Sequence, residues 1–286
     1  MSKNINEKET FNSLVNNLID NYDFSFKKSL GQNFIVDENI IGNIIDRSNI
    51  KANSLVIEVG PGAGALTRFL ALKAKKVISY EIDIKLKPIL NKTLSEYDNV
   101  QVIYDDFLKR SVKNDIEKDY DGIYLIANLP YYITTPIITK IINEGINIDE
   151  IIIMVQKEVG QRFMAAPKQK NYNSLSIFLD YYFEIKKLFD VSRNVFYPKP
   201  NVDSIVLSLK KREKAKVNVL DENLFFNLVR DSFKYKRKTI RNNLFNYNLD
   251  IIKKVLEKYG LGLTARGEEI TIEQFADIAN NLKTFN

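Results

Sequence analysis

The sequence predicts an α/β protein in which a doubly wound, Rossmann-like sheet domain is followed by a smaller all-helical C-terminal domain. Short apolar runs alternate with longer stretches that carry apolar residues at helical spacing, as βαβ units do. Several of these runs end in an acidic or amide residue, where the ligand sites of open α/β sheets lie. The C-terminal part of the chain shows helical spacing only.

The first part of the chain supplies the predicted sheet. Its apolar runs are rich in Val and Ile, which is typical of buried parallel strands. Between them, apolar residues recur every three or four positions, as on one face of a helix. We therefore expect strands at 55–59, 77–80, 100–104, 123–127, 150–155 and 202–209, and helices at 38–47, 66–72, 84–94, 136–143 and 157–164.

Two further stretches complete the predicted organisation. Apolar residues at helical spacing near the N-terminus predict a short amphipathic helix. Residues 210–216 are almost entirely charged and predict a domain boundary. Beyond them the spacing is helical, and Thr271 with Gln274 predicts a capping box for the last helix. We expect an N-terminal extension at 1–25, a sheet domain at 26–212 and a helical domain at 213–286.

The composition excludes several kinds of chemistry. The chain has 286 residues, of which 45% are hydrophobic and 27% charged, enough for a sizeable core. It contains no cysteine and no histidine, so disulfides, thiolate nucleophiles, histidine bases and ordinary zinc sites are excluded. No apolar run approaches the roughly 20 residues of a membrane span, and the N-terminus lacks a signal-peptide core. We expect a cytoplasmic protein that binds neither membrane nor metal.

A glycine-rich turn predicts a cofactor site. The strand at 55–59 runs into Gly60-Pro61-Gly62-Ala63-Gly64, where a ligand can approach the backbone without Cβ obstruction. The next strand ends in Glu81, 21 residues after Gly60, the spacing at which a carboxylate reaches ribose hydroxyls. With Ala65, the turn also satisfies the dinucleotide fingerprint. By itself it leaves both NAD and S-adenosylmethionine open.

The next two strand ends favour S-adenosylmethionine. The third strand ends in Asp105-Asp106-Phe107, where a carboxylate would accept the adenine amino hydrogen of that cofactor, and the fourth ends in Asn128. Acidic or amide residues at successive strand ends fit a class I methyltransferase better than a dehydrogenase. Taken singly, Glu81 and Asp106 are also explained as solvated residues that end strands, so their joint spacing carries the prediction.

The stretch Asn128-Leu129-Pro130-Tyr131-Tyr132 predicts methylation of an amino group on a base. The lone pair of adenine N6 is delocalised, so the amine reacts only when its hydrogens are drawn toward acceptors. Asn128 Oδ1 and the carbonyl of Leu129 or Pro130 would accept them, and Tyr131 would stack on the flipped base. No strong base is needed, because the methyl group of S-adenosylmethionine is already activated. The alternative is an ordinary turn after a strand.

Residues 234–241 contain five cations in eight positions, which predicts an RNA-binding surface. On a helix, all of them except Lys236 would share one face. The alternative is a solvated face, because the net charge of the chain is only +6. The predicted RNA-binding residues are Lys234, Lys236, Arg237, Lys238 and Arg241.

At these positions the chain resembles the KsgA-type ribosomal RNA adenine dimethyltransferases, a family related to the Erm resistance methyltransferases. The resemblance covers Phe26 to the C-terminus. It rests on Lys28-Ser29-Leu30-Gly31-Gln32-Asn33-Phe34, Glu58-Val59-Gly60-Pro61-Gly62-Ala63-Gly64-Ala65-Leu66-Thr67, Glu81, Asp106, Asn128 to Tyr132, Gln156-Lys157-Glu158-Val159, and Phe196-Tyr197-Pro198-Lys199-Pro200-Asn201-Val202-Asp203-Ser204.

The resemblance implies a role for each motif. Gln32 and Asn33 would border the methionine end of S-adenosylmethionine, Glu81 would hold its ribose and Asp106 would contact its adenine, although Asp105 is an alternative for that contact. Phe196 would form the second face of the base clamp, and a core aromatic is an equal alternative for it. The predicted cofactor-binding residues are Gln32, Asn33, Phe34, Gly60, Gly62, Gly64, Glu81, Ile82, Asp106, Phe107 and Asn128. The predicted catalytic residues are Asn128, Leu129, Pro130, Tyr131 and Phe196.

The resemblance also implies an activity, the S-adenosylmethionine-dependent N6-dimethylation of two adjacent adenines near the 3′ end of 16S rRNA in the small ribosomal subunit. We expect the enzyme to act as a monomer. An Erm-like enzyme acting on 23S rRNA is the first alternative, and residues 236–244 look KsgA-like instead. A non-catalytic ribosome assembly factor, a small-molecule methyltransferase and an NAD oxidoreductase are the others.

Overall fold

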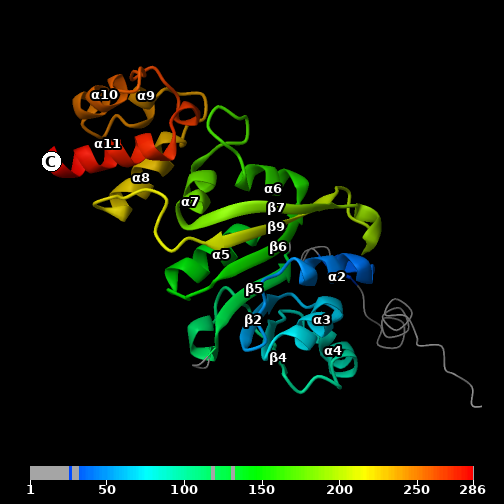
Figure 1. Cartoon of the computed structure of the whole chain (residues 1–286). Helices are drawn as coiled ribbons and strands as arrows, with labels where there is room; N and C mark the ends of the chain where they lie inside the picture. Colours follow the sequence, from blue (N-terminus) through cyan, green and yellow to red (C-terminus); the bar gives the residue numbers. More distant parts are fainter. Residues whose placement is uncertain (1–25, 28–31, 117–119, 130–132, 286) are drawn as a thin grey trace, which may run out of the picture. The chain divides into compact units, whose positions relative to one another are not determined.

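The computed structural model describes residues 26–27, 32–116, 120–129 and 133–285, which form two compact units (Figure 1). The first unit contains residues up to Lys157 and Lys187–Leu209, and the second contains Glu158–Lys186 and the residues from Lys210 onward. The predicted helix at the N-terminus lies outside the described residues.

A seven-stranded sheet in the order β4-β3-β2-β5-β6-β9-β7 confirms the predicted α/β fold. β2 is parallel to β3 and to β5, and the pairs β3–β4 and β5–β6 are also parallel. The chain passes from β2 to β3 and β4, then returns to place β5 on the other side of β2. This switch point is where doubly wound sheets bind ligands. The strands are β2 Ser54–Val59, β3 Lys76–Tyr80, β4 Val100–Ile103, β5 Gly122–Asn128, β6 Glu150–Gln156, β7 Phe183–Val191 and β9 Ser204–Lys211.

The central strands form the core because both of their faces are covered. All six residues of β2 are buried, and Ile57 pairs in register with Ile78 of β3 and Leu125 of β5. Burying a side chain of this size contributes roughly 1.5 to 3 kcal/mol. Three helices lie beside these strands (Figure 1), and their buried side chains form a cluster with Val56 of β2 and Val77 of β3. They are α2 Glu38–Asp46, α3 Ala65–Lys73 and α4 Lys87–Thr93.

The helix predicted at 84–94 is divided in two. Asp83 accepts a hydrogen bond from the Lys85 N–H and caps a short 3-10 helix, η2 Ile84–Leu86. Pro88 then stands in the first turn of α4, where its missing N–H costs nothing. The helices α5 Thr134–Asn143 and α6 Lys157–Phe163 match the predicted ranges within a few residues, although all of α6 except Lys157 belongs to the second unit. Two short strands, β1 Phe34–Ile35 and β8 Phe196–Tyr197, form a separate antiparallel pair.

The second unit has a helical core of its own. Its elements are α7 Ser174–Tyr182, α8 Glu222–Ser232, α9 Ile240–Asn243, α10 Leu249–Glu257, η5 Gly267–Glu269 and α11 Ile272–Phe285. The predicted capping box is present at the start of α11, because Thr271 Oγ1 accepts from the Gln274 N–H and Gln274 Oε1 accepts from the Thr271 N–H.

Residues 158–186 belong to this helical unit, which differs from the domain boundary expected at 212. The side chain of Ile177 lies in the same buried cluster as Phe225 and Ile278. The Tyr172 hydroxyl donates to the Ile270 carbonyl at 3.1 Å. Both contacts join residues that are far apart in the sequence, so local spacing gave no sign of them.

The sequence also did not predict α7 and β7. Tyr182 ends α7 and Phe183 begins β7, so no glycine or proline separates helix from strand. β7 stands at one end of the strand order, and its exposed Lys186 and Lys187 interrupt the apolar alternation. Charged residues are common on such edge strands.

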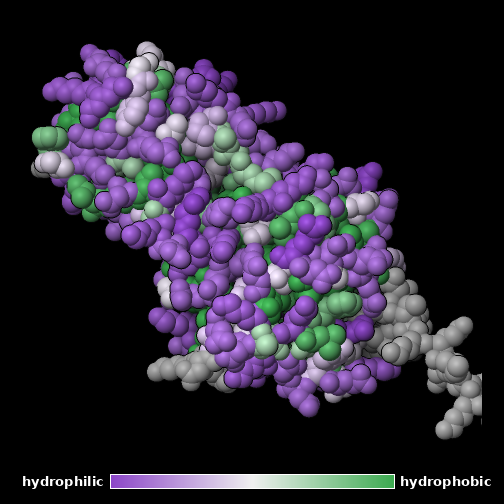
Figure 2. Space-filling model, in the orientation of Figure 1, coloured by the Kyte–Doolittle hydropathy of each residue, from purple (hydrophilic) through white to green (hydrophobic). Residues whose placement is uncertain are grey.

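Hydrophilic side chains cover most of the face of the molecule seen in Figure 2. Within the described ranges, no helix combines the length and the apolar character that crossing a bilayer requires.

Candidate cofactor and base site

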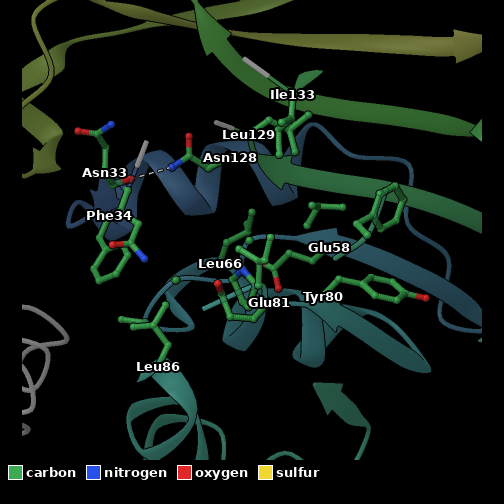
Figure 3. Close-up of a pocket in the computed structure, with 18 of the residues that line it drawn as sticks. Asn33, Phe34, Glu58, Leu66, Tyr80, Glu81, Leu86, Asn128, Leu129 and Ile133 are labelled. Atoms are coloured by element: carbon green, nitrogen blue, oxygen red, sulfur yellow. Dashed lines mark hydrogen bonds between the residues drawn. The ribbon is translucent and has the colours of Figure 1, made fainter. Parts of the chain in front are cut away.

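A cavity of about 270 Å³ lies in the first unit at the carboxyl ends of β2, β3 and β5 (Figure 3). Most of the predicted cofactor and catalytic residues line it. These are Gln32, Asn33, Phe34, Gly60, Gly62, Glu81, Ile82, Asp106, Phe107, Asn128 and Leu129. Pro130 and Tyr131 lie outside the described residues.

The glycine turn lines the cavity and brings backbone without side chains to its surface. Gly60 and Gly62 have positive φ angles of 73° and 59°, which side chains rarely tolerate. A Cβ at position 62 would lie 2.9 Å from the Phe34 ring, so this ring and the turn pack without any side chain between them. Gly64 does not line the cavity. It begins α3 with φ 88°, and a Cβ there would meet Thr93 Oγ1 at 3.0 Å.

Glu81 is buried beside this turn, with 4% of its surface exposed. The Asp83 N–H donates to Glu81 Oε1 at 2.8 Å. Burial raises the pKa of Glu81 to about 7, although hydrogen bonds from the backbone of Asp83, Gly62 and Ile82 oppose the rise. A carboxylate that is so poorly solvated gains from a ligand that donates hydroxyl groups to it.

A second buried carboxyl group lines the cavity and was not among the predicted site residues. Thr67 Oγ1 and Ser79 Oγ each donate to Glu58 Oε2 at 2.7 Å. Burial raises the pKa of Glu58 to about 7, and the nearby Glu81 adds to this rise. An acidic residue in an otherwise apolar strand was the signal in the sequence, because carboxyl groups are seldom fully buried without a role.

The two aspartates after β4 both line the cavity, but they are held differently. Asp106 is half-buried, accepts from the Leu108 N–H at 2.9 Å and has Lys109 3.5 Å away. Asp105 is exposed and pairs with Arg110 at 3.3 Å. Both aspartates thus pair with a cation, Asp105 with Arg110 and Asp106 with Lys109. The side chain of Lys109 is 83% exposed.

Asn128 stands half-buried at the end of β5 (Figure 3). Its Nδ2 donates to the Asn33 carbonyl at 3.0 Å. A carbonyl oxygen only accepts, so this bond fixes which end of the amide is nitrogen and leaves Oδ1 directed elsewhere. Leu129 is buried, and its N–H donates to the Met154 carbonyl at 3.3 Å. The amide is therefore oriented by bonds within the protein.

Phe34 and Phe196 lie on the two strands of the small β1–β8 sheet. The register pairs Phe34 with Tyr197 and Ile35 with Phe196. Phe196 is only 4% exposed, belongs to the buried cluster and is not a lining residue of the cavity. Phe196 therefore lies where a core aromatic would, which is one of the two alternatives that the sequence allowed for this residue. Its part in a base clamp stays a prediction.

Residues 234–239 of the basic segment are not helical, and of the five cations only Arg241 lies on a helix, the short α9, which corrects the prediction that they share a helical face. Residues 233–239 form a turn-rich loop between α8 and α9. The buried Asn243 organises it, since its Nδ2 donates to the carbonyls of Ser232 at 2.8 Å and Tyr235 at 3.2 Å, and its Oδ1 accepts from the Tyr235 N–H at 3.1 Å. We call residues 233–239 with Arg241 the basic loop.

All five predicted RNA-binding cations are exposed on the basic loop. Lys234 Nζ lies 5.6 Å from the centre of the Tyr235 ring. Sixteen ion pairs are found among the described residues, and none of them involves these five cations. Positive charge left uncompensated in this way favours a polyanion as partner.

The fold and the cavity together define a Rossmann-like class I methyltransferase. The sequence model of the ribosomal RNA adenine dimethylase family matches residues 23–284, so the chain belongs to this family. A ribosomal RNA small subunit methyltransferase A from Macrococcus caseolyticus is 48% identical over 277 residues, which cover 94% of each chain. A protein of the same name from Staphylococcus aureus is also 48% identical and covers 94% of this chain and 93% of its own.

Solved structures agree with this assignment. A dimethyladenosine transferase from Plasmodium falciparum superimposes with a TM-score of 0.71 at 27% identity, over 86% of this chain and 95% of its own. The 23S rRNA methyltransferase ErmE superimposes with a TM-score of 0.68, also at 27% identity, over 88% of this chain and all of its own. The chain is thus a methyltransferase of ribosomal RNA adenine.

Proposed function

We propose that this enzyme uses S-adenosylmethionine to dimethylate N6 of two adjacent adenines near the 3′ end of 16S rRNA in the small ribosomal subunit, acting as a monomer in the cytoplasm. The observation that carries the proposal is the series of polar groups around one cavity, Glu81 after β3, Asp106 after β4 and Asn128 at the end of β5. The 48% identity to small-subunit enzymes, against 27% to the 23S enzyme, favours the small-subunit substrate.

The cavity residues fit the proposed cofactor. The absence of a side chain at Gly60 leaves open space beside the turn, and the buried carboxyl group of Glu81 would accept hydrogen bonds from the ribose hydroxyls. Asp106 would accept a hydrogen bond from the amino group of the cofactor's adenine. When bound, S-adenosylmethionine supplies a methyl group that is already activated for transfer.

The protein's own contribution is orientation. Asn128 Oδ1 would accept a hydrogen from the target amine and so localise its lone pair for attack. The bond from Asn128 Nδ2 to the Asn33 carbonyl holds this acceptor before the base arrives, so little reorganisation is needed. We also propose that Tyr131 and Phe196 contact the flipped base, as the resemblance implies.

The basic loop supports the proposed RNA substrate. Its exposed cations would neutralise phosphates without reading the bases, so the loop would supply affinity and the cavity specificity. This role does not require a helix, because phosphate contacts depend on charge and reach more than on a shared helical face.

The test is to map N6-dimethyladenine in both ribosomal RNAs from cells with and without this protein, and to repeat the transfer with purified components. We expect two adjacent modified adenines near the 3′ end of 16S rRNA that depend on the protein. Modification of 23S rRNA alone would identify an Erm-like enzyme. Loss of neither modification, together with no transfer by the purified protein, would identify an assembly factor without catalysis.

A further inference from the structure

Asp83 is hydrogen-bonded to two residues that line the cavity, Glu81 and Gln32. It is 2% exposed, and its backbone N–H donates to Glu81 Oε1 at 2.8 Å. Its carboxylate accepts from Lys27 Nζ at 2.8 Å, from Gln32 Nε2 at 3.1 Å and from the Lys85 N–H at 3.2 Å. Both carboxylate oxygens are therefore engaged, which is more than capping the short helix η2 requires.

The carboxylate form of Asp83 is favoured in this position. Burial by itself raises the pKa of Asp83, but the hydrogen bonds from Lys27, Gln32 and the Lys85 N–H, together with the charge of Lys27, hold the pKa below its usual range. Lys27 supplies the balancing charge, and its side chain is 40% exposed. Gln32 is bound at both ends, since its Oε1 accepts from the Lys27 N–H at 2.8 Å.

The bonds continue toward Asn128. Gln32 is followed directly by Asn33, and the Asn33 carbonyl is the group that accepts from Asn128 Nδ2. One connected path thus leads from Glu81 through Asp83 and Gln32 to Asn33 and Asn128. All of these residues except Asp83 line the cavity. Asp83 is the member that joins its cofactor side to its base side.

We propose that Asp83 is a positioning residue for methyl transfer, which holds Gln32 and thereby the Asn33 carbonyl where that carbonyl orients the Asn128 amide. The inference rests on the proposed function, because it assigns Asn128 to the target base. It gives a role to a buried residue that does not line the cavity. It also explains why a lysine and a glutamine from the chain before β1 converge on one buried carboxylate after β3.

The variant Asp83→Asn tests this, because it keeps the backbone bond to Glu81 and the size of the side chain while removing one acceptor. We expect the single-turnover rate of methyl transfer, at saturating S-adenosylmethionine and small subunits, to fall roughly three- to thirtyfold. Lys27→Met should act in the same direction, and Lys27→Arg should retain most of the rate. Lys140→Met is the matched control, because Lys140 of α5 forms a part-buried ion pair with Glu144, just after the helix, and neither residue lines the cavity.

The decisive measurement combines Asp83→Asn with Asn128→Ala. If Asp83 acts through Asn128, the double variant transfers methyl groups at the rate of Asn128→Ala alone. A purely structural Asp83 would lower the melting temperature and leave the rate of the folded enzyme at saturation unchanged, which overturns the inference. Rate losses that multiply in the double variant overturn it as well. Both results leave the proposed function intact, whereas a wild-type protein that transfers no methyl group overturns the proposed function.

Discussion

The cavity of the first unit and the basic loop of the second differ in how their polar groups are supported. In the cavity, Glu58 and Glu81 are buried and each is held by neighbouring hydrogen bonds. In the basic loop the cations are exposed, and the buried side chain of Asn243 holds the backbone instead. The cavity therefore has fixed geometry suited to chemistry, and the loop presents charge on long side chains suited to a flexible polyanion.

Because of this difference, substitutions in the two regions should have different kinds of effect. Removing one oriented group from the cavity should act on a single step, because hydrogen bonds within the protein hold that group in one position. Removing charges from the loop should act gradually, since exposed cations share the same phosphates and are screened by salt.

Asn128→Ala should give the largest effect. Loss of the oriented acceptor should lower methyl transfer by about a hundredfold or more, because the acceptor acts chiefly in the transition state. Cofactor affinity should stay nearly unchanged. Single-turnover transfer and titration calorimetry measure the two quantities separately, and a rate within a few fold of the wild type would contradict activation of the amine by Asn128.

Glu81→Ala should weaken binding of S-adenosylmethionine by roughly 1.5 to 3 kcal/mol, the cost of losing charge-assisted hydrogen bonds to the ribose. The wild type should not bind NAD. Calorimetric titration of both ligands checks this expectation. Equal affinity in the variant, or comparable affinity of the wild type for NAD, would remove the cofactor assignment from this turn.

Replacing Lys234, Arg237, Lys238 and Arg241 together with Gln should weaken binding of the small subunit. The slope of log affinity against log salt should flatten by roughly 0.7 to 0.9 for each phosphate contact that is lost. Because Asn243 holds the loop backbone, the fold and the cofactor affinity should not change. An unchanged salt slope would show that the loop is only a solvated surface.

The pH should have the smallest effect, and it should act on the cavity alone. The pKa values of Glu58 and Glu81 are raised to about 7, so below that pH the ribose acceptor is increasingly protonated. Cofactor affinity should rise by up to about tenfold per unit from pH 6 to about 7 and then level off. Glu81→Gln should remove most of this dependence. Affinity that falls as the pH rises would contradict a carboxylate acceptor.

The same pKa shifts have the opposite sign for the stability of the cofactor-free protein. A raised pKa in the folded state favours the protonated form, so this contribution is complete below about 4.5 and is lost as the pH rises through about 7. Melting temperatures of wild type and Glu58→Gln between these values check the sign, since the variant should lose less stability as the pH rises.

Much of the fold and the cavity could be predicted because their signals are local. A glycine turn after an apolar strand, and a polar residue at each strand end, are patterns within a few residues, and they located Gly60, Glu81, Asp106 and Asn128 beside one cavity. The resemblance assigned Gln32 and Asn33 to the cavity, and residue spacing alone would not have done so.

The missed features depend on contacts between distant residues. Asn243 bonds to the Ser232 carbonyl and turns an apparently helical segment into a loop. Asp83 receives Lys27 from 56 positions earlier. Tyr172 reaches Ile270, 98 positions away, and draws residues 158–186 into the helical unit. The spacing of residues in the sequence does not indicate any of these contacts.

In the basic loop, the residue that fixes the backbone shape is not one of the residues that carry the charge. The amide of one residue sets the backbone path, while five other side chains carry the charge and make no ion pair within the described chain. Each cation can therefore be exchanged without rebuilding the loop. Such a surface can adjust its affinity for a polyanion in small steps over evolutionary time, or in a designed series of variants, on an unchanged scaffold.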